Sequence, residues 1–586
     1  MRLCSISLIA AVAGIVNAPV LAQGVGYPVE RSWPDYFLEH EKYFEPQTYK
    51  IEGAPIWSIN NPEDWAVNCT LIEGDDELIV YDTGLSRENG EACLAEIRKI
   101  SDKPIRTIFY SHHHTDHYNG TDALVSAEDV LAGRVKIYAW ENFEEELASE
   151  FGATGPIQAL RVGYYTGTFL PEEDRHHHGC CGSRYGGTSG YIPPTDTFDE
   201  NTTLTISGVR IEVIYTGGEA SSEFGLRLPD YRTVIVADEI YPAHPNMYTI
   251  RGAPFRRTEG YLRAYDTVLA FDDTEHLLGS HMPPINGRDE IRNVVTKYRD
   301  LVQYVHDQSV RRINKGDGIP ELRETFDDVP EWLELEPYNM EMYGTLEHNA
   351  AQQFAGYMGW FNGDPTDYRP TPAREAAVRY VELMGGRNAV FSEAEQAFNA
   401  GDPQWTAELL VHVLRVNPDD IDARNLKAAA LRTLGYQELN TTWRAWYLTA
   451  ALEYEGSLDL EAIGAFFGAI IFPDPASVSL RSVFENYRYR VDADAVAGQQ
   501  LSLAIDVETD EDLTLMLRNG VLILEDGVSA GADVVMSVAR SDLNPVLRGE
   551  ATWADLEFES TGDTDLARSF WDYFDTEIFA DHIAVR

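Results

Sequence analysis

The hydrophobic pattern of the first half of the chain predicts short strands that alternate with helices. Residues 71–84 contain two apolar runs around an acidic turn, which is typical of a β-hairpin. Residues 92–100 have helical apolar spacing, and residues 105–110 form an apolar run rich in β-branched side chains. Residues 209–215 alternate between apolar and polar positions, as a half-buried strand does. This order indicates a layered α/β domain that extends to about residue 315.

The pattern changes after Asp317, where strand signals fade and helical segments follow one another to about residue 455. Residues 403–436 predict a helical hairpin, with a first helix to Val416, a turn at residues 417–418 and a second helix that ends at Gly435. Taken alone, this hairpin is typical of a tetratricopeptide-like packing unit that carries no chemistry.

The remaining residues, from about residue 456 onward, predict a third and smaller unit. Residues 501–507 and 513–524 have the pattern of strands, and Asn519-Gly520 is a strong two-residue hairpin turn. Residues 566–579 predict a terminal amphipathic helix. We expect a small α+β domain with an apolar interior and no catalytic motif.

The N-terminus has the pattern of a secretory signal peptide. Arg2 precedes an almost wholly apolar stretch over residues 3–16, and small residues follow before Gln23. This arrangement predicts cleavage after Ala22 and a periplasmic or secreted protein. The alternative is a buried N-terminal helix.

The composition restricts which partners the protein can bind, but it does not indicate a function. The chain has 586 residues, which suggests about three domains, and its net charge is −50. Such a surface would repel nucleic acid and anionic membranes, and no internal stretch reaches the roughly 18–20 apolar residues of a membrane span. Four cysteines remain once Cys4 is removed with the signal peptide, too few for a disulfide scaffold; one bridge is possible, and its pairing stays open among Cys69, Cys93, Cys180 and Cys181.

Candidate chemistry begins where the predicted strand over residues 105–110 ends. The next residues have the spacing His112-x-His114-x-Asp116-His117. Imidazole and carboxylate together suit zinc, and alternate residues of an extended loop point the same way, so His112 and His114 can chelate one ion. Asp116 and His117 then project toward a second site. This loop indicates a binuclear zinc hydrolase.

Further ligands should follow strands in the same manner. Glu219 follows the strand over 209–215, Asp238 and Glu239 follow an apolar run over 233–237, and His281 follows another over 277–280. Together they complete two metal sites. Residues 176–181, His-His-His-Gly-Cys-Cys, also look metal-binding, but adjacent histidines cannot all face one ion; we interpret this segment as a glycine-rich loop near the cleft.

Three blocks of sequence identify a family resemblance. They are the loop from His112 to His117, the run Tyr248-Thr249-Ile250-Arg251-Gly252, and a helical region that contains Gly359-Trp360-Phe361-Asn362-Gly363-Asp364-Pro365 and Arg379-Tyr380-Val381-Glu382-Leu383-Met384-Gly385-Gly386. The chain resembles the bacterial alkyl sulfatases (SDS-hydrolase type) of the metallo-β-lactamase superfamily over nearly all of its mature length.

The resemblance implies an α/β metallo-β-lactamase αββα sandwich, then an all-α dimerisation domain, then a C-terminal α+β domain similar to sterol carrier protein 2. The expected bounds are a signal peptide over 1–22 and domains over 23–315, 316–455 and 456–586. It also implies two zinc ions per chain, a homodimer, and an alkyl sulfate substrate whose tail the C-terminal domain would gather.

The resemblance assigns ligands and substrate contacts residue by residue. One zinc would take His112, His114 and Glu219, and the other Asp116, His117 and His281. The spacing to Arg251 assigns the bridging acid to Asp238, although the family usually has Glu and Glu239 lies beside it. The expected contacts to the substrate sulfate are Arg251, His348, and Tyr343 or Tyr357.

Two alternatives to alkyl sulfate hydrolysis stay open at this point. One is a metallo-β-lactamase-fold hydrolase of another ester, a lactone or a phosphodiester. The other is a lipid-binding assembly protein with a retired catalytic domain, against which the intact ligand set argues. Residue types alone do not decide the alkyl chain length or whether the S–O or the C–O bond is cut.

Overall fold

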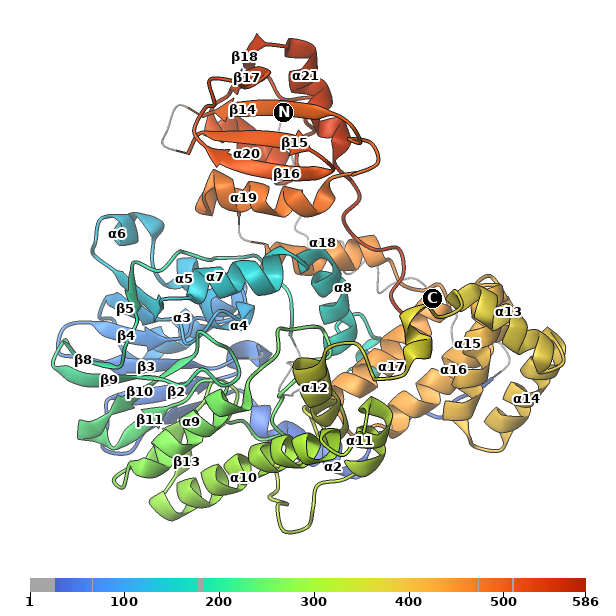
Figure 1. Cartoon of the computed structure of the whole chain (residues 1–586). Helices are drawn as coiled ribbons and strands as arrows, with labels where there is room; N and C mark the ends of the chain where they lie inside the picture. Colours follow the sequence, from blue (N-terminus) through green and yellow to red (C-terminus); the bar gives the residue numbers. More distant parts are fainter. Residues whose placement is uncertain (1–26, 66, 176–183, 473, 508–510, 586) are drawn as a thin grey trace.

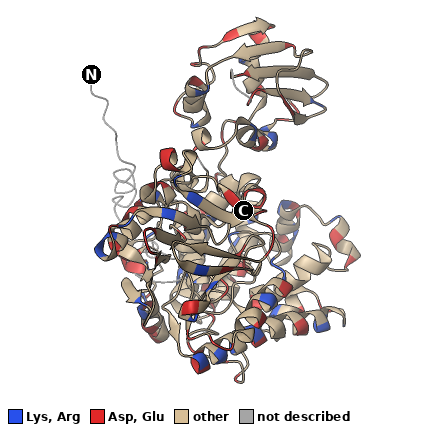
Figure 2. Cartoon of the chain, turned by 90° about the vertical axis from the view of Figure 1, so that its left-hand side faces the viewer, with Lys and Arg blue, Asp and Glu red and all other residues tan. Residues whose placement is uncertain are grey.

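The computed structural model describes residues 27–65, 67–175, 184–472, 474–507 and 511–585 (Figure 1). The predicted signal peptide and the His176–Cys181 segment lie outside the described residues. In Figure 2 the Asp and Glu positions, coloured red along the ribbon, occur in all parts of the chain that this view shows. Among the described residues, no helix combines the length and the apolar character needed to cross a membrane.

Two β-sheets packed face to face form the first domain. The first sheet has seven strands in sequential order: β1 Gln47–Lys50, β2 Ile56–Asn60, β3 Cys69–Glu73, β4 Leu78–Tyr81, β5 Ile105–Phe109, β6 Lys136–Trp140 and β7 Asp196–Phe198. The second sheet has six in the order β13-β12-β11-β10-β9-β8: β8 Thr202–Ile206, β9 Val209–Tyr215, β10 Phe224–Leu228, β11 Thr233–Ile235, β12 His276–Leu278 and β13 Ile285–Asn286. Both sheets mix parallel and antiparallel pairs.

Alternation along the strands explains the layers. Ile79 faces the second sheet and joins one apolar core with Phe224, whereas its neighbour Val80 faces outward and packs in another cluster with Ile97 of helix α3 (Arg87–Ile100). Helices α9 (Thr258–Ala270) and α10 (Arg288–Ile313) cover the outer face of the second sheet. The predicted αββα sandwich is therefore confirmed.

The local predictions in this domain are also confirmed. Strands β3 and β4 pair as an antiparallel hairpin, and β9 spans the predicted residues 209–215. Helix α3 starts where the Ser86 side chain accepts a hydrogen bond from the Asn89 backbone N–H, which caps the free end of the helix. A disulfide between Cys69 and Cys93 joins β3 to α3 and answers the open question of pairing for these two residues.

A helical region follows, as predicted. Its helices are α11 Ile319–Thr325, α12 Leu346–Met358, α13 Ala373–Leu383, α14 Arg387–Asn399, α15 Pro403–Val416, α16 Ile421–Gln437 and α17 Thr441–Tyr454. Helices α15 and α16 confirm the hairpin predicted over 403–436, and aspartates cap both of them. Beyond residue 455 comes α18 (Leu460–Ile471), which packs closely on α8 (Gly155–Thr166) of the first domain.

The C-terminal unit is a five-stranded sheet with helices, as expected of an α+β domain. The strand order is β16-β15-β14-β17-β18, with β14 Gln500–Asp506, β15 Leu513–Arg518, β16 Val521–Asp526, β17 Val534–Ser537 and β18 Glu559–Gly562. Its helices are α19 Leu480–Tyr487, α20 Arg540–Leu547 and α21 Thr564–Ser569. Asn519 and Gly520 both have positive φ, the geometry of the predicted two-residue hairpin turn.

The helix predicted over 566–579 is wrong in extent. Helix α21 ends at Ser569, and a 3-10 turn over Phe570–Tyr573 follows. The tighter turn buries Phe570, Trp571 and Phe574 together in the core of the domain. The apolar spacing that resembled a helix thus reflects packing around a turn.

The chain then leaves this domain and returns to the helices below it (Figure 1). Phe579 packs against Gly464 of α18. The backbone N–H groups of Ile583, Ala584 and Val585 all donate to the carboxylate of Glu453 on α17, at 2.7–3.2 Å. The C-terminal tail is therefore fastened to the body of the molecule.

Candidate metal centre

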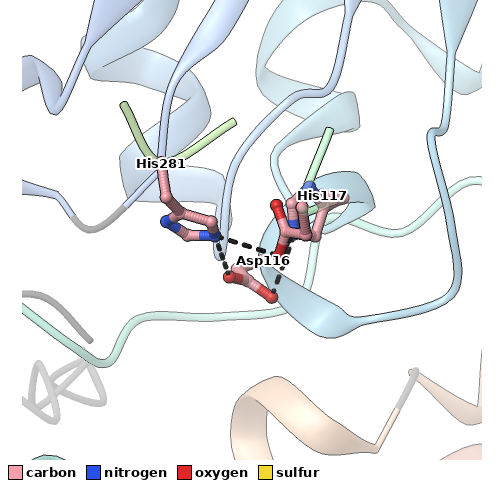
Figure 3. Close-up of side chains that lie close together, drawn as sticks. Asp116, His117 and His281 are labelled. Carbon is pink, nitrogen blue, oxygen red and sulfur yellow. Dashed lines mark ion pairs between the residues drawn. The ribbon is translucent and has the colours of Figure 1, made fainter. Parts of the chain in front are cut away.

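Side chains from four strand ends meet at one edge of the sandwich. The loop after β5 carries His112 to His117, and later strands are followed by Glu219, Asp238 and His281. Figure 3 shows His281 facing Asp116 and His117, two neighbouring residues of another segment. Loops anchored on rigid strands can hold such side chains in fixed positions.

Two groups of possible metal ligands share one carboxylate. The first group is Asp116, His117, Asp238 and His281. In it, Asp238 Oδ2 lies 3.3 Å from both His117 Nε2 and His281 Nε2, and Asp116 Oδ2 lies 3.2 Å from His281 Nε2. The second group is His112, His114 and Asp238. Asp238 is therefore placed where a bridging ligand would lie.

The unsatisfied atoms of these residues fit a divalent metal. His117 Nε2, Asp238 Oδ1 and Glu219 Oε2 are buried and have no hydrogen-bond partner among the described residues. Burial lowers the pKa of His112 and of His114 well below the usual value, so both imidazoles are neutral, which is the form that binds metal. Burial alone would raise the pKa of Asp238, but His281 and His117 lower it well below its usual range. Asp238 and Asp116 in turn raise the pKa of both histidines, so without a metal these acids and imidazoles pair with one another.

Glu219 lies in the same cavity, outside both compact groups. Its Oε1 atom accepts a hydrogen bond from Arg256 Nη1 at 2.6 Å, while Oε2 is the atom without a partner. Burial raises the pKa of Glu219 to about 7, and Arg256 opposes that rise. Glu239 instead accepts a hydrogen bond from the Gly218 backbone N–H at 3.0 Å and belongs to neither group of ligands.

Asp82 orients two of the ligand histidines, and our sequence analysis missed it. Its Oδ2 atom accepts hydrogen bonds from His117 Nδ1 at 2.8 Å and from Ser280 Oγ at 2.7 Å. It also accepts from Ser111 Oγ at 3.0 Å, and this hydroxyl lies 2.9 Å from His112 Nδ1. These contacts turn Nε2 of both histidines toward the candidate metals. Asp82 follows strand β4 directly, so the rule that found the other ligands could have found it.

We expect Asp82→Asn to lower metal affinity or kcat/KM by about 10–100-fold, the usual effect of losing a carboxylate that orients a metal-bound histidine. Zinc titration of the apoprotein, followed by activity assays at saturating zinc, measures both effects. Asp76→Asn is the matched control, because Asp76 lies exposed in the turn of the same hairpin. Equal zinc affinities and equal activities of the two variants would contradict this role.

A cavity joins the candidate metals to an apolar wall. Metal-side residues His114, Asp116, Asp238, His281 and Glu219 line one part of it, next to Arg251 and Arg256. The apolar part is formed by Leu85, Phe151, Val162, Phe467, Ile470 and Ile471. Helices α8 and α18 supply most of this apolar wall. No described residue after Ile471 lines this cavity, and the expected role of the C-terminal domain in gathering an alkyl tail stays a prediction.

The four predicted substrate contacts divide into two pairs. Arg251 and Tyr343 line the cavity as expected. His348 does not: the Thr345 backbone N–H lies 3.2 Å from its Nε2, and Nε1 of Trp443 on α17 lies 3.3 Å from its Nδ1. A neutral imidazole can accept at one of these two nitrogens. Tyr357 is 49% exposed, and its hydroxyl lies 2.8 Å from His306 Nε2. His348 and Tyr357 therefore do not line this cavity, and their contacts to the substrate sulfate stay predictions.

Arg256 is a second cation in the cavity that our sequence analysis missed. It is buried, it pairs with Glu219, and its Nη1 atom also donates to the Asn246 backbone carbonyl at 2.7 Å. Two arginines, a cluster of metal ligands and an apolar wall make a cavity suited to a molecule with an anionic head and an apolar tail.

Comparison with protein-family models covers the three parts of the chain. Residues 62–281 match the metallo-beta-lactamase superfamily, residues 319–457 match alkyl sulfatase dimerisation, and residues 475–580 match alkyl sulfatase C-terminal. These matches follow the order of the three structural units described above.

Curated relatives and solved structures agree with these matches. A linear primary-alkylsulfatase of Pseudomonas sp. (strain ATCC 19151) is 38% identical over 489 residues, which are 82% of this chain and 92% of the relative. An alkyl/aryl-sulfatase of Saccharomyces cerevisiae is 30% identical over 83% of this chain and 76% of its own length. The structure of a stereoselective inverting sec-alkylsulfatase from Pseudomonas sp. matches the fold with a TM-score of 0.82, at 24% identity and 99% coverage of both chains.

Proposed function

The chain belongs to the alkyl sulfatases of the metallo-β-lactamase superfamily, and from this premise we propose that it hydrolyses alkyl sulfate esters to an alcohol and inorganic sulfate. The observation that carries the proposal is the composition of the cavity. Metal ligands and Arg251 lie on one side of it, and the apolar wall of α8 and α18 lies on the other. An alkyl sulfate has an anionic head and an apolar tail, which match these two parts.

Two zinc ions per chain complete this site in our proposal. His112, His114 and Glu219 would hold one ion, Asp116, His117 and His281 would hold the other, and Asp238 would be shared by the two sites. The set of imidazoles and carboxylates suits zinc, and the free Oε2 atom of Glu219 can act as a ligand while Oε1 stays paired with Arg256. Bound zinc lowers the pKa of a coordinated water toward 7 and so supplies hydroxide at neutral pH.

The residues of the chain then bind and orient the ester. Arg251 offers charged N–H donors to the sulfate oxygens, and such charge-assisted hydrogen bonds are about twice as strong as neutral ones. Phe467, Ile470 and Ile471 provide apolar surface for the first carbons of the tail and exclude water from the anionic head.

The direct test is release of sulfate from dodecyl sulfate by the purified, zinc-loaded protein in oxygen-18 water. We expect sulfate and dodecanol, with two zinc ions per chain by elemental analysis. The label enters sulfate if the S–O bond is cut and enters the alcohol if the C–O bond is cut. The proposal is contradicted if no alkyl sulfate of any tested chain length releases sulfate. If a lactone or a phosphodiester is hydrolysed instead, hydrolysis of that substrate becomes the function.

We also propose that the chain forms a homodimer through an exposed arm. In the arm, residues 355–375, every residue except Phe361 is exposed, and Trp360 and Tyr368 are 76% and 62% exposed. It lies within the region that matches alkyl sulfatase dimerisation. Large aromatic side chains on an extended segment need a partner surface, and a second copy of this chain provides one.

Replacing both Trp360 and Tyr368 by serine is expected to shift the protein from dimer to monomer at micromolar concentration, because aromatic anchors contribute most of the energy of an interface. Sedimentation velocity measures the shift. Leu131→Ser is the control: Leu131 is 89% exposed on α6 (Ala127–Leu131) of the first domain. A dimer of unchanged stability in the double variant would contradict the placement of the interface on the arm.

Export from the cytoplasm is the last part of the proposal. The apolar N-terminal segment is typical of a signal peptide, and the Cys69–Cys93 disulfide fits an oxidising compartment. Intact-mass analysis of the periplasmic and secreted fractions should find a mature chain that starts at Gln23. A chain that keeps residues 1–22 and stays in the cytoplasm would contradict export.

A further inference from the structure

Arg251 is held at one of its nitrogens only. Its Nη1 atom donates to Gln158 Oε1 at 2.7 Å and to the Gly252 carbonyl at 3.0 Å, and it lies 2.9 Å from Glu150 Oε1. The Phe151 ring lies 5.1 Å from the centre of the guanidinium group. Among the described residues, no polar contact of Arg251 involves Nε or Nη2. This arrangement leaves the second edge of the guanidinium group for a ligand in the cavity.

The residues that hold Arg251 come from a single irregular segment. Glu150 and Phe151 belong to a π-helical turn over Ala148–Gly152, and Gln158 lies in the first turns of α8. π-Helical turns are rare, and they occur frequently at functional sites. Here the wider turn brings a charged and an aromatic side chain to the same guanidinium group.

Glu150 also joins Arg251 to the metal-binding loop. Its second oxygen, Oε2, lies 3.2 Å from Nε2 of His113, the residue between the two ligands His112 and His114. His113 Nδ1 is in turn 2.7 Å from the Ser222 hydroxyl. Glu150, His113 and Ser222 are all buried. Polar contacts through Glu150 and His113 therefore connect Arg251 to the loop that carries four candidate ligands.

The pair of Glu150 and Arg251 is ionised throughout the working range of pH. Burial alone would raise the pKa of Glu150, but Arg251 and His113 outweigh burial and lower the pKa to about 2. An arginine side chain has many rotamers, and ordering one costs entropy unless its partners fix it before the ligand binds. Glu150, Gln158 and Phe151 hold the Arg251 side chain in one rotamer before the ligand binds.

We propose that Glu150, Phe151 and Gln158 are positioning residues that hold Arg251 so that its free edge receives the sulfate group, with Glu150 setting the distance between this edge and the metal loop. The proposal rests on the proposed function, in which Arg251 binds the anionic head of the substrate. Glu150 and Gln158 act through Arg251 and do not line the cavity, whereas Phe151 also belongs to its apolar wall.

A double-mutant cycle with dodecyl sulfate as substrate tests the proposal. Glu150→Ala should raise KM about tenfold, the effect expected from losing one charge-assisted contact, with little change in zinc content. Glu150→Gln keeps an acceptor oxygen and should stay within about threefold of the unmodified enzyme. In an Arg251→Ala background, Glu150→Ala should cause no further rise in KM, because its partner is already absent.

The outcomes separate this inference from the proposed function. If the unmodified enzyme releases no sulfate, the proposed function fails. If it does, and Glu150→Ala leaves KM unchanged or raises it equally with and without Arg251, the positioning role is overturned. Should Glu150→Ala fail to fold, Gln158→Met replaces it in the cycle. This substitution removes a neutral acceptor of similar size and should raise KM about threefold, again only when Arg251 is present.

Discussion

Replacing Asp238 by asparagine is expected to lower kcat/KM for dodecyl sulfate by about 10⁴-fold or more and to leave fewer than two zinc ions per chain, because in the proposed function Asp238 would help to hold both ions, and bound zinc would supply the hydroxide. Asp238 is the one residue common to both main ligand groups, and its Oδ2 atom lies within 3.9 Å of imidazole nitrogens in both. Asparagine has a similar size but lacks the negative charge that binds two cations. Elemental analysis and steady-state kinetics on the same sample measure both effects.

Glu239→Gln is the matched control, since the two acids are neighbours and the chemical change is the same. Glu239 accepts a hydrogen bond from the Gly218 backbone and lies outside both ligand groups. We expect this variant to keep two zinc ions and most of its activity. The reverse result, with zinc lost in Glu239→Gln and kept in Asp238→Asn, would assign the bridging role to Glu239.

Replacing Arg251 by alanine is expected to raise KM for dodecyl sulfate about 100-fold, with the zinc content unchanged. Two charge-assisted hydrogen bonds to an anion are worth a few kcal/mol. The polar partners of Arg251 are Gln158, Gly252 and Glu150, and none of them belongs to the two main ligand groups. Steady-state kinetics over a range of substrate concentrations, with zinc analysis in parallel, separates loss of binding from loss of metal.

Arg251→Lys distinguishes geometry from charge. Lysine keeps the positive charge but presents a point charge instead of a planar fork, so KM should fall between those of the alanine variant and the unmodified enzyme. A KM for Arg251→Ala equal to that of the unmodified enzyme would remove Arg251 from the substrate site and would shift attention to Arg256, the other arginine that lines the cavity.

Sequence patterns predicted the fold and the candidate metal ligands because both depend on local signals. An apolar strand followed at once by a ligand residue is visible along the chain, and this rule found Glu219, Asp238 and His281. Hairpins at residues 71–84 and at Asn519-Gly520 depend on short turn motifs and are confirmed in the same way. Such features need no knowledge of distant contacts.

Sequence patterns reveal less where a role depends on which distant side chain a residue meets. His348 matches a family position, and Thr345 and His348 also form a capping arrangement at the start of α12, in which Thr345 Oγ1 accepts from the His348 backbone N–H. That spacing is itself a local signal for a helix start. Glu150 and Arg256 carry no local signal, because the side chains of His113, Glu219 and His114 that they meet lie 37 to 142 residues away along the chain.

The fastened C-terminal tail has a consequence for how the last domain is connected. The chain leaves the body of the molecule at Phe472 and re-enters it at Phe579, and a Cβ atom placed on Gly468 would lie 3.3 Å from the first ring and 3.7 Å from the second. Entry and exit therefore lie beside the same turn of α18. The two segments that connect the C-terminal domain to the rest of the chain thus lie side by side, as they do in an inserted domain. Such a domain can be replaced by another without a change in the fold of the remaining chain.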